Sequence, residues 1–151
     1  MPAVNGPSGM AVTYTVYTDP VTGLPFTVTN TDTTVLGTLT AAAVGSNGAD
    51  LTNLVYRGVK IVVDITTIAG TAPTLIVTIQ GKDVVSGKYY TLLASAALAV
   101  TGTTVMTVYP GLIAAANLTA NDVLPKTWRV ITTIGGTTPA VTATVGASLV
   151  R

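Results

Sequence analysis

The chain has 151 residues, of which 48% are hydrophobic and only 9% are charged, and its formal net charge is +1. It contains no Cys and no His, and all six acidic residues are Asp. This composition excludes disulfide scaffolds, thiol catalysis, Cys/His zinc sites and every mechanism that needs an imidazole. The length suits one domain with a substantial core.

The charge pattern and the apolar stretches argue against two classes of partner. Seven Lys and Arg residues are scattered along the chain, without the basic patch of a nucleic-acid-binding protein, so we expect no nucleic-acid partner. The longest apolar stretches, 94–100 and 112–116, are far shorter than the roughly 20 residues of a membrane-spanning helix, so we expect no membrane partner. Residues 1–10 show neither the charged nor the apolar region of a secretory signal, which predicts synthesis in the cytoplasm.

The first ten residues are turn formers without periodicity, and they predict a flexible N-terminal arm ahead of a β domain at 11–151. Such an arm is either a frayed terminus or a segment that docks on a neighbouring subunit. In the docking interpretation, Val4, Asn5 and Met10 are candidate interface residues.

The rest of the chain predicts short β-strands. Thr and Val make up about a third of it, and several windows alternate apolar and polar residues as a half-buried strand does. The predicted strands, in chain order, lie near 12–17, 26–29, 34–39, 59–65, 75–80, 88–93, 103–109, 128–134 and 141–145. A helical turn is considered only at 94–100 and 112–117. This pattern predicts an all-β, single-domain antiparallel β-sandwich of the jelly-roll type, with an immunoglobulin-like sandwich as the alternative.

One sequence element occurs twice. Residues 65–73 read ITTIAGTAP and residues 131–139 read ITTIGGTTP, each between two alternating stretches. We interpret each copy as a β-hairpin with a Gly-Thr turn.

No catalytic or cofactor-binding constellation is found. Ser86 and Lys88 could form a dyad on paper, but the sequence DVVSGK is typical of a solvated turn. Residues 81–89 differ from a phosphate-binding loop in glycine spacing and lead into a strand. The six Asp residues are spread singly, without a calcium-loop pattern. We therefore expect a protein that is not an enzyme and has no metal or cofactor.

The aromatic residues give two further expectations. Trp128 lies on the apolar side of its strand and is predicted to be a core residue. Tyr89 and Tyr90 are adjacent in a strand and must face opposite sides, so one of them is expected to be exposed or at an interface. Tyr89 and Tyr109 are the aromatic candidates for a protein–protein interface.

The C-terminal two-thirds of the chain, residues 59–149, resembles virion structural proteins of tailed bacteriophages. The resemblance rests on GKDVVSGKYYTLLAS at 81–95, VYPGL at 108–112, LPKTWRV at 124–130 and the final Thr-rich segment ending VGA at 145–147. It does not extend to the first 50 residues. It implies a small β-barrel or jelly-roll decoration (cement) protein on the outer surface of a capsid, forming homotrimers and clamping neighbouring major capsid subunits. It implies no catalytic residues.

The leading hypothesis is therefore a capsid decoration protein located in the virion, with the major capsid protein and other copies of itself as partners. Alternatives are a tail or head–tail connector subunit, in which the segment Thr40–Thr52 would be the sheet-extending loop, and a glycan-binding module using loop Asp, Asn and Tyr residues.

Overall fold

The computed structural model of the chain describes residues 4–5, 11–12, 17–18, 23, 25–26 and 31–151, and all regular structure in these residues is β-strand. The strands are β1 (Val4–Asn5), β2 (Ala11–Val12), β3 (Tyr17–Thr18), β4 (Pro25–Phe26), β5 (Thr31–Ala42), β6 (Leu51–Thr52), β7 (Gly58–Lys82), β8 (Tyr89–Ala94), β9 (Gly102–Val108), β10 (Thr119–Ala120) and β11 (Thr127–Val150).

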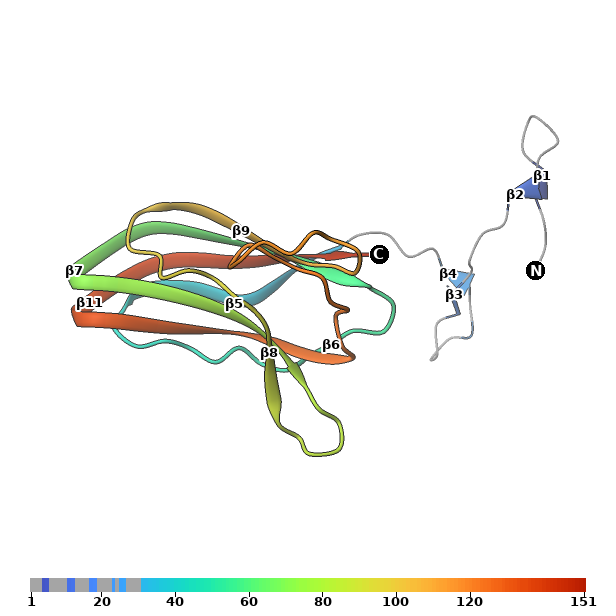
Figure 1. The fold of residues 1–151 in the computed structure, drawn as a ribbon, viewed down its shortest axis with the longest axis horizontal. Coiled ribbons are helices and arrows are strands. Elements are labelled where there is room, and N and C mark those ends of the chain that lie inside the picture. Colours follow the sequence, from blue (N-terminus) through green and yellow to red (C-terminus); the bar gives the residue numbers. More distant parts are fainter. Residues whose placement is uncertain (1–3, 6–10, 13–16, 19–22, 24, 27–30) are drawn as a thin grey trace.

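Two long strands form the frame of the molecule. β7 has 25 residues and β11 has 24, and they pair antiparallel from Gly58 opposite Val150 to Gly81 opposite Trp128. Figure 1 shows this two-stranded ribbon running to one end of the molecule, bending over and returning, so that each strand contributes to both layers. The separate short strands expected at 59–65 and 75–80 are thus two halves of one strand.

The other strands extend the two layers. In the first layer the order is β10, β9, the first half of β7, the second half of β11, and β5. In the second layer β8 pairs with the second half of β7, and β6 pairs with the start of β11. Every pairing among the described strands is antiparallel except that of β10 with β9. The predicted β-sandwich is confirmed.

The core lies between the two layers and follows the predicted alternation. Val59, Ile61 and Val63 on the first half of β7 are fully buried, as are Leu75 and Ile79 on the second half. Trp128 is 1% exposed, which confirms it as a core residue; its Nε1 donates to no acceptor among the described residues. Burying one such apolar side chain stabilises the fold by about 1.5–3 kcal/mol, so alternation on two long strands supplies most of the driving force for folding.

The repeated sequence element forms the bend of the ribbon, and its prediction as two hairpins is wrong. In a hairpin the two arms pair with each other, whereas here the residues on either side of Gly70 pair with β11. The ladder continues through the bend, with Ala69 opposite Ala140 and Thr71 opposite Thr137, interrupted by register shifts. Turn residues predict a change of direction correctly, but they do not say which strand is the partner.

The two copies are related by a local twofold axis between Thr71 and Thr137. Gly70 and Gly136 have φ of +119° and +110°, while Ala72 and Thr138 both have φ of +47°. A Cβ on Gly70 would lie 2.7 Å from the Thr138 carbonyl oxygen, and a Cβ on Gly136 would lie 2.7 Å from the Ala72 carbonyl oxygen. Each copy therefore packs against the other in the same way, and each uses glycine where a side chain has no room.

The described N-terminal residues form two small sheets that share no strand pairing with the main sheet: β1 pairs with β2, and β3 pairs with β4. Residues 13–16 and 27–29 of the predicted strands lie outside the described residues, and so do residues 1–3 and 6–10 of the predicted arm. The domain boundary at residue 10 stays a prediction.

The two segments considered for a helical turn are not helical. Leu98 instead forms a β-bridge with Leu75, with both N–H···O distances at 2.9 Å. In the other segment Ala115 bridges to Thr119, and residues 116–118 form a turn.

We expect Gly136→Ala to destabilise the protein by about 1–3 kcal/mol, because the variant must hold a side chain at positive φ against the backbone of β7. The measurement is urea unfolding followed by fluorescence of Trp128, the sole tryptophan. Gly146→Ala is the control, because an added Cβ there meets no atom within 4 Å. Equal stability of the two variants would refute this account of the bend.

Candidate interaction surfaces

A hairpin between β7 and β8 extends beyond the sandwich (Figure 1). Its turn is fixed by Asp83, whose carboxylate accepts hydrogen bonds from the backbone N–H and the hydroxyl of Ser86. Two backbone bonds close the turn, from Gly87 N to Asp83 O at 2.9 Å and from Asp83 N to Lys88 O at 2.8 Å. The bonds from Ser86 hold the pKa of Asp83 below its usual range. The solvated-turn interpretation is therefore confirmed, and a Ser86–Lys88 dyad is not formed.

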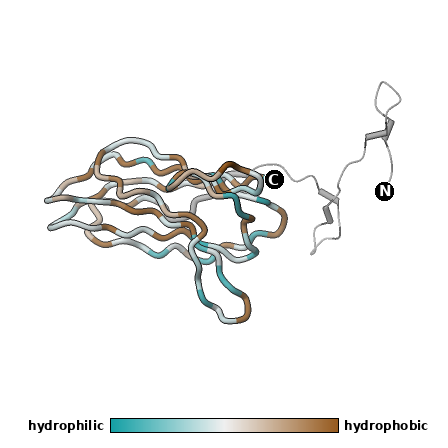
Figure 2. Tube along the Cα trace, viewed as in Figure 1, coloured by the Kyte–Doolittle hydropathy of each residue, from teal (hydrophilic) through white to brown (hydrophobic). Residues whose placement is uncertain are grey.

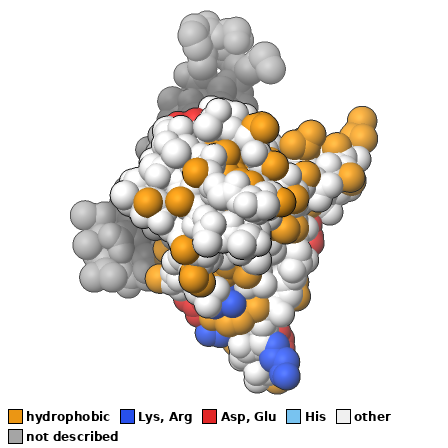
Figure 3. Space-filling view, turned by 90° about the vertical axis from the view of Figure 1, so that its left-hand side faces the viewer, with side chains coloured by type: hydrophobic (Ala, Val, Ile, Leu, Met, Phe, Trp, Pro, Cys, Tyr) orange, Lys and Arg blue, Asp and Glu red, His pale blue; other side chains and the backbone are white. Residues whose placement is uncertain are grey.

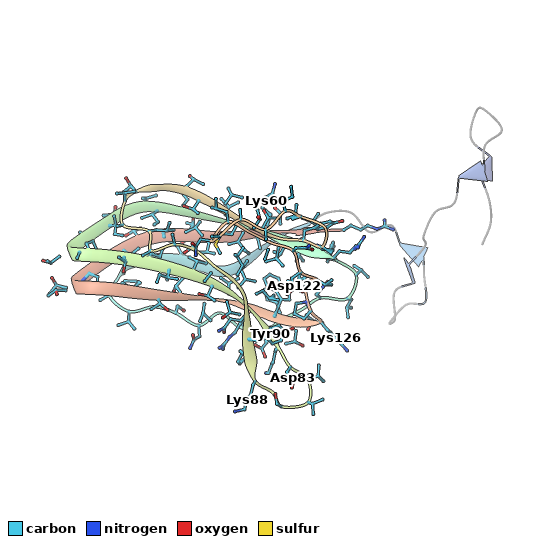
Figure 4. The ribbon with its side chains drawn as sticks, in the orientation of Figure 1. Lys60, Asp83, Lys88, Tyr90, Asp122 and Lys126 are labelled. Carbon is cyan, nitrogen blue, oxygen red and sulfur yellow. The ribbon has the colours of Figure 1, made fainter. Side chains whose placement is uncertain are left out.

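The tip of this hairpin presents two adjacent valines to solvent. Val84 is 81% exposed and Val85 is 96% exposed. Figure 2 shows a hydrophobic tip on an otherwise largely polar hairpin, and Figure 4 labels Asp83 and Lys88 on either side of it. Apolar side chains held in water on a rigid turn gain free energy when a partner covers them.

The base of the hairpin is fastened by a polar group that we call the hairpin-base cluster: Asp50, Gln80, Lys82, Tyr89 and Arg129. The Asp50 carboxylate accepts from Lys82 Nζ and from the Tyr89 hydroxyl, both at 2.7 Å. The Arg129 guanidinium lies 3.4 Å from the centre of the Tyr89 ring, and its Nε donates to Gln80 Oε1 at 2.9 Å. Two distant segments of the chain, those of Asp50 and Arg129, thus fasten the base of the hairpin.

These bonds also set the charge states of the cluster. The hydrogen bonds from Lys82 and then Tyr89 lower the pKa of Asp50, and the same Asp50 bond raises the pKa of Lys82. Both groups are partly open to water, so the ion pair orients the hairpin more than it stabilises the fold.

The predicted interface residues have different positions. Tyr89 is engaged in the hairpin-base cluster, whereas its neighbour Tyr90 is 45% exposed and its ring lies against Gly81 on the other side of the strand. The expectation that one of the pair is exposed is therefore confirmed. Tyr109 lies against Gly58, and its hydroxyl donates to the Arg151 carbonyl oxygen at 3.0 Å.

The remaining candidates belong to the N-terminal region. Val4 pairs with Val12, and Asn5 pairs with Ala11, both within the small β1–β2 sheet. Met10 lies outside the described residues. Strand pairing brings neither Val4 nor Asn5 together with Tyr89 or Tyr109.

A second surface lies at the end of the sandwich where the ribbon bends, away from the hairpin, which projects from the side (Figure 1). We call it the charge-free end: residues 41–46, 66–74, 96–101 and 133–140, none of which is charged. Pairing brings the four segments together, with Ala42 opposite Val141, Leu98 opposite Leu75 and Ser46 hydrogen-bonded to Thr132. Figure 3 looks onto this end and shows mostly uncharged side chains, with charges at the margins and below.

Val44 and Val100 stand out on the charge-free end, at 78% and 74% exposed. The other exposed side chains there are Ala and Thr. The sequence analysis missed this surface, although the signal was present: long stretches without charge, 33–49, 65–81, 89–121 and 130–150, alternate with short charged ones.

Searches of the described residues for other kinds of site give two results. They contain no group of three Asp, Glu, His or Cys side chains placed to share a metal ion. Among the same residues, no helix has the length and hydropathy needed to cross a bilayer.

Comparison with known proteins adds no relative: no family model matches the chain, and neither the curated proteins nor the solved structures contain a match.

The hairpin-base cluster predicts a pH dependence. Because the folded pKa of Asp50 is lowered, its contribution to stability is fully present above the ordinary Asp pKa of about 4 and is lost as the pH falls through the folded value. We expect Asp50→Asn to lower the thermal midpoint at neutral pH and this difference to shrink below about pH 4.

The matched control is the same substitution in a Lys82→Met background, where the principal partner of Asp50 is gone and the difference should be small at every pH. A wild-type minus Asp50→Asn difference that grows on acidification would contradict this assignment.

Proposed function

We propose that this chain is a non-enzymatic virion structural protein, a decoration protein that binds the outside of a phage head and stabilises contacts between major capsid subunits. The observation that carries the proposal is the fastened hairpin with Val84 and Val85 at its tip. The resemblance of residues 59–149 to phage virion proteins, which includes this hairpin, supports the same assignment.

The hairpin has the properties of a preorganised docking element. Its turn is closed by Asp83 and its base by Asp50 and Arg129, so little conformational entropy remains to be lost when it binds. Adjacent exposed valines at the tip are suited to an apolar pocket on a protein surface. Such an element needs no reactive group, only a complementary surface.

Binding of this kind would stabilise a shell by mass action. A protein that binds the assembled shell and not its free subunits shifts the assembly equilibrium by RT ln(1 + [L]/Kd), which is about 4 kcal/mol at a thousandfold excess over Kd. Many weak contacts repeated over a shell therefore suffice.

The alternatives have less support. The segment Thr40–Thr52, which a tail subunit would use to extend its sheet, is hydrogen-bonded along β11 through Ser46 and Gly48. For a glycan-binding module, neither adjacent tyrosine offers an open stacking platform: the Arg129 guanidinium covers the ring of Tyr89, and the ring of Tyr90 lies against Gly81.

The proposal is tested by sedimenting heads of the parent phage, stripped of this protein, with purified chain. We expect wild-type protein to co-sediment and to raise the temperature at which the heads rupture, and we expect Val84→Asp/Val85→Asp to lose at least tenfold in affinity, because carboxylates cannot enter an apolar pocket.

Ile113→Asp/Val123→Asp is the matched control, since it also adds two carboxylates at exposed apolar positions, on the connections that precede and follow β10 rather than on the hairpin. Its affinity should equal that of the wild type. Failure of the wild-type chain to bind heads would refute the function, and equal loss in both variants would refute the role of the hairpin.

A further inference from the structure

The charge-free end is unusual for a surface exposed to water. Ordinary soluble proteins contain about 25% charged residues, and their surfaces hold most of them. Here four converging segments contain no charged residue, at the end where the ribbon bends (Figure 3), and their most exposed side chains are Ala, Thr and Val. Depletion of charge is the compositional mark of the buried centre of a protein–protein interface.

The surface is also preformed. The two bends pack against each other around Thr71 and Thr137, with glycine backbone at their closest approaches. In the loop that carries Val44, the Ser46 N–H donates to Thr132 Oγ1 and the Thr132 N–H donates to the Ser46 carbonyl oxygen, both at 2.8 Å. The loop that carries Val100 is joined to β7 by the β-bridge between Leu98 and Leu75. Burial of this end therefore requires little ordering of the chain.

The absence of charge restricts the kind of surface that this end can bind. A partner with a charged face would leave its ions desolvated and unpaired, because this end offers no opposite charge. An identical charge-free end has no such cost, and like charges cannot repel across the contact. We infer that copies of this chain bind one another through their charge-free ends, with Val44 and Val100 in the contact.

This arrangement leaves the hairpin free, because it lies away from the bend of the ribbon (Figure 1). Self-association is part of the proposed function, and this inference adds the surface through which it occurs. The inference does not depend on binding to a capsid. It concerns the purified chain alone.

The test is the solution mass of the full chain by light scattering after size exclusion, over a concentration series. We expect the wild type to have a multiple of the 15.2 kDa chain mass. We expect Val44→Asp/Val100→Asp to have the mass of one chain, because each copy would place carboxylates against those of its neighbour. Raising the salt concentration should leave the wild-type assembly intact, since it contains no ion pair to screen.

The double variant Ile113→Asp/Val85→Asp is the control: it adds the same two negative charges at highly exposed positions outside the charge-free end and should keep the wild-type mass. Far-ultraviolet circular dichroism and Trp128 fluorescence show whether each variant is folded. A wild-type chain that stays at 15.2 kDa up to about 100 µM, the Kd range of weak association, overturns the inference, as does an unchanged mass in the double variant. A chain that assembles but does not bind heads would refute only the proposed function.

Discussion

The antiparallel ladder between β7 and β11 is the constraint on which the rest of the structure depends. Because the same two strands cross from one layer to the other, the register that places Val59 inward also determines which side of the second layer faces the core. The crossing requires a sharp bend in both strands at once, which the positive φ of Gly70 and Gly136 allows. β5, β8, β9 and β6 then only add to edges that the ribbon provides.

This frame separates two kinds of surface. Charged residues gather where the strands end in the hairpin and in the loops around Asn53, whose side chain bonds to Tyr56 and to the Leu124 carbonyl oxygen. The bend, in contrast, is held by glycine conformation and tight backbone packing, and its described residues form no ion pair. Polar side chains therefore orient the hairpin. The bend needs no charged side chain, and its surface is suited to burial.

The sequence predicts the local features of the fold well and the long-range ones poorly. Alternation at Val59–Ile65 and Leu75–Ile79 gives both the strands and their buried faces, and Trp128 is correctly placed in the core. The repeated element predicts a change of direction but not its partner, because pairing across many residues leaves no local signal. The environment of Tyr89 is equally hidden, since Asp50 and Arg129 come from distant segments. The charge-free end could have been found from the spacing of charges once the layers were known.

The folding of the ribbon has a consequence for synthesis. β7 leaves the ribosome before its partner β11 exists, so the edge of β7 that later pairs with β11 stays open, although β8 and β9 can already pair with the other edge. Open edges of this kind are prone to pair with other chains. Pro73, which lacks a backbone N–H, and Gly70 interrupt the strand at its middle and divide it into two shorter segments. The bend that later folds the ribbon over thus also shortens the uninterrupted strand edge that the nascent chain presents.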